Sequence, residues 1–169
     1  MAVREIVLHP DDRLRRKCKR VSRDERGLEQ LIDDMIETMA EAHGVGLAAP
    51  QVGVPLRLTV IRLPEDYDDA RAGEVIVLVN PDIVKSAGEW EPDEGCLSIP
   101  GYVANVKRQW SVTVRARDRS WREFRVRGEG LLGQALQHEI DHLHGLLFID
   151  RLESMDQLRK VERESAAAT

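Results

Sequence analysis

Residues 137–142 read Gln-His-Glu-Ile-Asp-His, and this run constrains the chain more than any other feature. Two histidines four residues apart project from the same face of a helix, and Glu139 follows the first of them directly. This spacing is typical of two imidazole ligands for one divalent metal, with a carboxylate beside a metal-bound water. The alternative is a helix that carries two packed or solvated histidines. The pattern favours a metal-dependent hydrolase.

The length and charge of the chain limit the other classes of function. A chain of 169 residues without internal repeats predicts one domain, residues 1–169. Its net charge is -5, with acids and bases interspersed, which argues against nucleic-acid binding and predicts no direct binding of DNA. One basic cluster is the exception, and we expect it to be a solvated surface. It comprises Arg13, Arg15, Arg16, Lys17, Lys19 and Arg20.

Targeting signals and cysteine content point to the cytoplasm. The first ten residues carry charges at Arg4 and Glu5 and lack the apolar core of a secretion signal. No stretch is long and apolar enough to suggest a membrane span. The two cysteines, Cys18 and Cys96, are expected to be reduced thiols. We therefore predict a cytoplasmic protein without membrane association.

Periodicity predicts the secondary structure. Apolar residues recur every three or four positions over residues 22–43, which indicates an amphipathic helix that ends at Gly44. Short β-type segments follow at residues 56–61, 75–79, 102–106, 112–116 and 124–126, and antiparallel pairing is expected. The acidic stretch 64–73 predicts an exposed loop, and residues 118–120 a turn.

Helical periodicity returns over residues 130–144, where the metal-ligand motif lies beside apolar stripes. The metal helix is therefore also expected to be a core helix. Residues 153–169 predict a weak C-terminal helix, with Met155, Leu158 and Val161 three apart. The predicted fold class is α+β: antiparallel β-sheets packed around a central metal-binding helix, with an N-terminal amphipathic helix and a C-terminal helix.

The third metal ligand decides the class of hydrolase. The metzincin pattern requires a third histidine where this chain has Phe148, which excludes that family. A thermolysin-like enzyme would use a downstream glutamate, here Glu162 or Glu164. Cys96 is the better candidate, because it lies in Glu-Gly-Cys-Leu-Ser-Ile-Pro and a thiolate binds a divalent metal strongly. Its alternative role is that of a small core residue.

Three segments in this order resemble the motifs of peptide deformylase. They are GVGLAAPQ at residues 44–51, EGCLSIP at 94–100 and QHEIDHLHG at 137–145. Residues 6–15 are similar to the N-terminal signature of the same family. The resemblance extends from Ile6 to about Leu152. It implies an enzyme that removes the formyl group from the N-terminal formyl-methionine of nascent polypeptides and releases formate.

The resemblance also implies a ligand set and a mechanism. It places Cys96, His138 and His142 on one Fe²⁺ ion per chain, for which Zn²⁺, Ni²⁺ or Co²⁺ can substitute. Glu139 would accept a proton from the metal-bound water and return it to the departing amine. The side chain of Gln51 and the backbone N–H of Leu97 would stabilise the oxyanion.

The same resemblance suggests how the substrate is held. Val45, Leu131 and Ala135 would line an apolar pocket for the methionine side chain. The peptide would add as a strand along the backbone of Gly44, Val45 and Gly46. N-formylmethionyl nascent peptides are thus the implied partners, ribosome association near the exit region is compatible with the resemblance, and a monomer is expected.

Two alternative classes remain open from the sequence. A zinc endopeptidase of the HExxH type would need a downstream carboxylate as its third ligand, and a non-catalytic metal-binding or peptide-binding module would need no base. Asp141 is expected to support the ligands or to form a helix salt bridge. Gly133 and Gln134 place a helix-weakening residue and a polar residue just before the motif.

Overall fold

The computed structural model describes residues 2–161, and its fold is α+β, as predicted. Two α-helices, α1 (Leu28–Glu41) and α2 (Gly130–Leu143), confirm the helices expected from periodicity over residues 22–43 and 130–144. Four short 3₁₀ helices join the larger elements: η1 (Asp12–Arg15), η2 (Ala49–Val52), η3 (Phe148–Arg151) and η4 (Met155–Gln157).

The strands form two antiparallel sheets, again as predicted. The five-stranded sheet has the order β1-β2-β3-β6-β7, and the three-stranded sheet has the order β4-β5-β8. The larger sheet contains β1 (Gly46–Ala48), β2 (Leu58–Arg62), β3 (Val75–Ala87), β6 (Ser111–Arg117) and β7 (Glu123–Glu129). The smaller contains β4 (Asp93–Cys96), β5 (Ile99–Asn105) and β8 (Arg159–Lys160).

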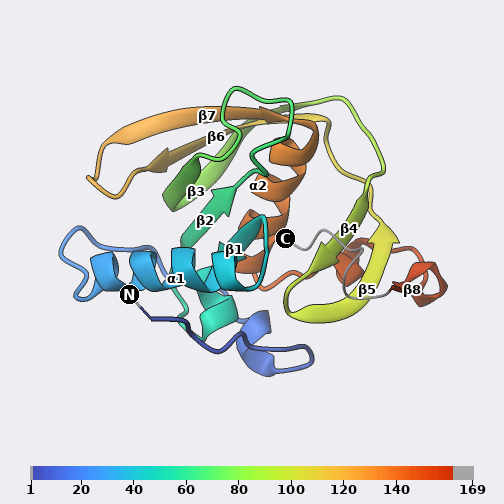
Figure 1. Ribbon diagram of the computed structural model, residues 1–169, viewed down its shortest axis with the longest axis horizontal. Helices are drawn as coiled ribbons and strands as arrows, with labels where there is room; N and C mark the ends of the chain where they lie inside the picture. Colours follow the sequence, from blue (N-terminus) through green and yellow to red (C-terminus); the bar gives the residue numbers. More distant parts are fainter. Residues whose placement is uncertain (1, 162–169) are drawn as a thin grey trace.

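The two helices pack against opposite faces of the larger sheet. Inward-facing residues of β3, β6 and β7 form one apolar cluster with Leu132, Leu136 and Ile140 of α2. Residues of α1 form a second cluster with β1, β2 and β3, which includes Met35 and Val60. Burial of these apolar faces is the main favourable contribution to the fold. The metal-ligand helix α2 therefore lies in the core, with β1 and β2 beside it (Figure 1).

The three-stranded sheet approaches α2 from the other side (Figure 1). A third apolar cluster holds it there, and Cys96, Leu147 and Phe148 are among its buried members. β4 ends at Cys96 and β5 begins at Ile99, so a tight turn presents residues 96–98 to the helix. The second motif of the sequence thus reaches the third through packing of the smaller sheet.

Several boundaries differ from the predicted ones. α1 begins at Leu28 rather than near Ser22, because Gly27 has the left-handed conformation (φ 75°). β3 continues to Ala87, well beyond the predicted end at Val79. Residues 64–73 form turns and bends, which confirms the predicted loop.

The predicted C-terminal helical tail, residues 153–169, is wrong for the part that the structure describes. Residues 155–157 form a single 3₁₀ turn and Arg159–Lys160 pair with β5, while residues 162–169 lie outside the described region. Of the apolar residues whose spacing suggested a helix, Leu158 packs against the third cluster, whereas Met155 is 58% exposed. None of the helices within residues 2–161 is long and apolar enough to cross a lipid bilayer.

Candidate metal centre

The side chains of Cys96, His138 and His142 converge on one buried point. Their candidate ligand atoms all lie within 4.8 Å of one another. Nε2 of His142 is 3.2 Å from Nε2 of His138 and 3.4 Å from Sγ of Cys96. The two imidazoles come from successive turns of α2, as the sequence spacing predicts, and the sulfur comes from the end of β4. At most 2% of any of the three residues is exposed.

These separations fit a tetrahedral transition-metal site. Metal–nitrogen bonds of about 2.0 Å and metal–sulfur bonds of about 2.3 Å, at tetrahedral angles, imply nitrogen–nitrogen distances of about 3.3 Å and sulfur–nitrogen distances of about 3.5 Å. The observed 3.2 Å and 3.4 Å lie close to both values. Three protein ligands leave a fourth position open for water or substrate, as in catalytic sites.

A buried ion-pair network orients the first histidine. Nδ1 of His138 lies 2.7 Å from Oε2 of Glu94, so Nε2 faces the metal position. Arg108 donates to Glu94 from Nε at 2.9 Å and also from Nη2. Burial alone would raise the pKa of Glu94, but the Arg108 hydrogen bonds and the charge on His138 outweigh it and lower that pKa to about 2. Glu94 is therefore a carboxylate that fixes the ring of His138.

The network continues to the end of α2. Nη1 of Arg108 donates to Oδ2 of Asp141 at 2.8 Å, and Arg151 donates to both oxygens of Asp141 at 2.6 Å and 2.7 Å. The ring of Phe148 stacks on His138 with centroids 6.4 Å apart. Asp141 therefore forms ion pairs with Arg108 and Arg151, and Phe148 packs against the ring of His138.

Glu139 is the only acid in the site without a partner among the described residues. Both of its oxygens are buried and accept no hydrogen bond, and burial raises its pKa to about 7. A methyl group on Gly46 of β1 would lie 2.5 Å from Oε1 and 2.9 Å from Cγ and Cδ of Glu139. Glycine at position 46 is therefore what allows the carboxylate to lie between β1 and the metal ligands.

The first motif supplies an amide to the same place. Gln51 is fully buried, and its Oε1 accepts a hydrogen bond from the backbone N–H of Ala48 at 2.9 Å. Its Nε2 donates to Ser98 Oγ at 3.1 Å and lies 3.6 Å from Cys96 Sγ. Leu97 lies in the turn beside Cys96, and its side chain packs where a Gly44 side chain would be, with Cδ1 2.7 Å from that position. The three motifs therefore meet at one centre.

The residues predicted to hold the substrate lie on β1, in the two residues before it, and on α2. β1, which contains Gly46, is an edge strand of the larger sheet, so one side of its backbone is not paired with another strand of that sheet. Val45 and Ala135 are buried in the α2 cluster, and half-buried Leu131 packs against it. Tyr67 from the loop joins the same cluster, and its hydroxyl accepts a hydrogen bond from the N–H of Leu131 at 3.1 Å.

Several site residues were not found from the sequence. Arg108 belongs to none of the three motifs. Ser98 lies in the second motif, but no role was predicted for it. Gln134 stands out in the sequence only as a polar residue just before the metal-ligand motif, yet it is buried and donates to the carbonyl oxygen of Asp93 at 2.9 Å. A methyl group on Gly133 would lie 2.9 Å from the carbonyl oxygen of Gly128, so close packing of α2 on β7 requires this glycine.

Comparison with known families decides between the hydrolase classes. The family model described as polypeptide deformylase matches residues 3–158. The chain belongs to this family. A peptide deformylase of Dehalococcoides mccartyi (strain CBDB1) is 48% identical over 161 residues, which cover 95% of this chain and 93% of the relative. A peptide deformylase of Thermomicrobium roseum is 46% identical over 172 residues, covering 99% and 98%.

Solved deformylase structures share the fold. The crystal structure of a peptide deformylase from Legionella pneumophila superposes with a TM-score of 0.84 at 50% identity, covering 92% of this chain and 89% of that one. A peptide deformylase from Synechococcus elongatus in complex with actinonin gives a TM-score of 0.82 at 42% identity, covering 90% and 80%. The chain is thus a metal-dependent hydrolase that removes the formyl group from N-formylmethionyl nascent peptides.

Proposed function

We propose that deformylation at this centre uses Glu139 as the group that moves the proton. The observation that carries the proposal is a fully buried carboxylate without a hydrogen-bond partner, next to three convergent metal ligands. A pKa near 7 suits a group that must both accept and release a proton at neutral pH. Glu139 takes a proton from the attacking water and then delivers it to the nitrogen of the departing amine.

We propose Cys96, His138 and His142 as the ligands and Fe²⁺ as the native metal. The Cys/His/His donor set also suits Zn²⁺, Ni²⁺ and Co²⁺, and the choice of iron rests on family membership alone. A divalent cation held there supplies Lewis-acid chemistry, which polarises a carbonyl oxygen and acidifies a water molecule. Glu94 and Arg108 keep His138 oriented for this task.

Gln51 and Leu97 stabilise the negative charge on the formyl oxygen. Gln51 Nε2 carries two N–H groups; one is used by Ser98, and the other is directed at a weak acceptor, the sulfur of Cys96. That second N–H can turn to the oxyanion with little loss. The backbone N–H of Leu97, in the turn after Cys96, is the second donor.

The substrate peptide extends the larger sheet. Gly44, Val45 and Gly46 offer backbone groups along the edge at β1, so the peptide binds there as an added strand. Val45, Leu131 and Ala135 form the wall against which the methionine side chain packs. Recognition through the main chain beyond methionine accepts many sequences, as an enzyme acting on nascent chains requires.

We propose further that the chain is a single domain, residues 1–169, and works as a cytoplasmic monomer near the ribosomal exit region. The three apolar clusters lie on connected elements, which supports one domain. Size-exclusion chromatography with light scattering tests the monomer, and cosedimentation with ribosomes tests the association.

Formate release from a formyl-Met peptide, measured anaerobically with metal analysis of the same sample, tests the mechanism. Glu139→Gln should keep the fold and the metal but lower kcat by about 10²–10⁴-fold, the usual contribution of a general base. Glu129→Gln, which changes an exposed acid at the start of α2, is the matched control and should retain activity. An unchanged rate in Glu139→Gln would exclude Glu139 as the proton carrier.

Cys96→Ala distinguishes the deformylase ligand set from that of an endopeptidase. Loss of bound metal supports the proposal, whereas full metal content would point to the downstream Glu162 or Glu164, which lie outside the described residues. Cleavage of internal peptide bonds by the wild-type enzyme would favour the endopeptidase alternative. Metal without any formate release would favour a non-catalytic module.

A further inference from the structure

On the face of the larger sheet that α1 packs against, strands β6 and β7 are not covered by any helix of the described residues. α1 covers this face over β1, β2 and β3, where Val60 and Val79 are buried against it. On β6 and β7 the alternate residues Val112, Val114 and Val126 point to α2 on the other face. The residues between them therefore point to the α1 side, beyond the reach of α1. Four of these residues are arginines: Arg115, Arg117, Arg125 and Arg127.

The register of the two strands places like charges together. Arg115 lies directly opposite Arg125, an arrangement that destabilises a sheet unless another charge compensates it. Neither side chain forms an ion pair or hydrogen bond with the described residues, and both are exposed. Arg127 pairs with Glu129 at 2.5 Å, and Arg117 donates only to the carbonyl oxygen of Trp121. On its other side Arg115 lies opposite Asp82 of β3, and Arg117 lies opposite Glu123 of β7.

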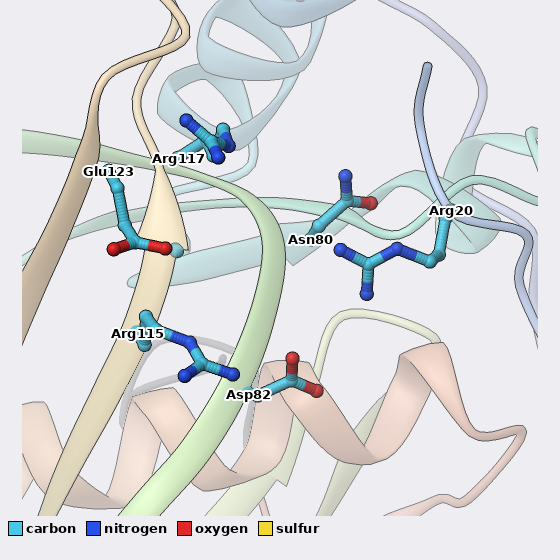
Figure 2. A pocket seen from close by; sticks show the side chains of 7 residues that line it. Arg20, Asn80, Asp82, Arg115, Arg117 and Glu123 are labelled. Atoms are coloured by element: carbon cyan, nitrogen blue, oxygen red, sulfur yellow. The ribbon is translucent and has the colours of Figure 1, made fainter. Parts of the chain in front are cut away.

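A second basic segment meets the row. Asn80 binds the backbone of Val21 through two hydrogen bonds, of 2.8 Å and 3.0 Å, and so fixes the segment that precedes α1 beside β3. Arg20 in that segment then faces Arg115 across a shallow depression of about 160 Å³, with Arg117 on its rim (Figure 2). Arg16, Lys17 and Lys19 continue the basic segment, and all are exposed.

Acids around the depression do not neutralise it. Asp82 is already bound by Arg57 at 3.0 Å, and Glu129 by Arg127. Glu123 is therefore the one carboxylate of this surface, among the described residues, that can offset four unpaired arginines: Arg20, Arg115, Arg117 and Arg125. These four arginines and Arg127, which is paired with Glu129, are called the arginine strip below.

We propose that the arginine strip is a docking surface for the phosphate backbone of double-stranded RNA. Guanidinium groups bind phosphate oxygens in forked pairs, and a row of unpaired arginines is complementary to a row of phosphates. None of the residues of β6 and β7 that point to this face is aromatic, so these strands offer no ring on which single-stranded bases could stack. This favours a duplex read by its backbone. The proposal is independent of the proposed function, because the strip shares no residue with the metal centre.

Fluorescence anisotropy with a labelled 20-base-pair RNA duplex tests the proposal on the full chain between 50 and 200 mM KCl. Arg115→Glu/Arg125→Glu should weaken binding at least tenfold and reduce the magnitude of the log affinity against log salt slope by about two. Lys107→Glu/Arg159→Glu is the matched control. It makes the same change of net charge on and beside the smaller sheet and should stay within twofold.

Four outcomes would overturn the proposal. The first three are no binding of RNA by the wild type at 50 mM KCl, unchanged binding in the strip variant, and an equal loss of binding in the control variant. The fourth is tighter binding of polyglutamate or of phosphatidylserine vesicles than of RNA. Formate release should be unaltered in both variants, which separates this test from that of the catalytic mechanism. If the strip variant fails to fold, Arg115→Gln/Arg125→Gln replaces it, with about a threefold or larger loss expected.

Discussion

The position of Gly46 against Glu139 allows the catalytic role of that carboxylate to be tested without changing it. In Gly46→Ala the new methyl group would lie 2.5 Å from Oε1, where an ordinary contact is at least 3.4 Å. The carboxylate must therefore move by about 0.9 Å, because the backbone of β1 is fixed by pairing with β2. A shift of about 1 Å in a catalytic group costs on the order of 100-fold in rate, equivalent to about 2.7 kcal/mol.

The assay is kcat/KM for formate release, measured with metal content and a thermal melt on each sample. We expect Gly46→Ala to bind a full equivalent of metal, since neither His138 nor His142 is displaced. A double-mutant cycle then identifies the route of the effect. In a Glu139→Gln background the proton carrier is already lost, so adding Gly46→Ala should cost less than about threefold.

Two results would refute this reasoning. If Gly46→Ala retained more than about a third of wild-type activity, the carboxylate would not need the position that the structure gives it. If the further loss in the Glu139→Gln background were again about 100-fold, Gly46 would act through something other than Glu139, such as the backbone that holds the peptide. A loss confined to KM would point the same way.

Two further predictions concern Arg108 and Cys18. Arg108→Ala should lower the melting temperature by about 10 °C, because it leaves Glu94 buried without its counter-charge, at a cost of about 3–5 kcal/mol. The control is Arg151→Ala, whose side chain is 41% exposed and whose loss should cost under about 1 kcal/mol; equal shifts in the two melts would contradict this. Cys18 should react with iodoacetamide about tenfold more slowly than an ordinary thiol at pH 7.5. Burial raises its pKa to about 11, which lowers the thiolate fraction about 100-fold, and the greater nucleophilicity of the thiolate offsets part of that loss. The rate is measured by mass spectrometry of timed samples, and an ordinary rate would exclude such burial.

The metal centre was predictable where it depends on local spacing. The pair His138 and His142 needs only helical geometry, and a helix at that position followed from apolar periodicity. Cys96 came from its neighbours in the motif and from the family resemblance. Arg108 could not be found in this way, because it lies 14 residues from Glu94 and 33 from Asp141 and meets both only in the folded chain. Long-range ion pairs leave no local pattern in one sequence.

The strands likewise were predictable where they depend on local pattern and not where they depend on a partner strand. The strand predicted over residues 75–79 continues as β3 to Ala87, past Pro81, which cannot donate a backbone hydrogen bond. The structure accommodates Pro81 with a shift of register between Val79 and Asp82, after which pairing with β6 resumes. Bulges depend on the partner strand, so a chain read by itself ends the strand too early.

The prediction that the chain does not bind nucleic acid stays a prediction, and our proposal departs from it for a physical reason. A net charge of -5 with interspersed signs was taken to disfavour nucleic-acid binding, but mixing along the chain is not mixing on a surface. In a strand, alternate residues share a face, and Arg115, Arg117, Arg125 and Arg127 are all at odd-numbered positions of paired strands. The intervening valines and alanine are buried, so every exposed position that they separate is polar. Charge therefore has to be counted by sheet face, and on that count this face of β6 and β7 carries four arginines against Glu123 and Glu129.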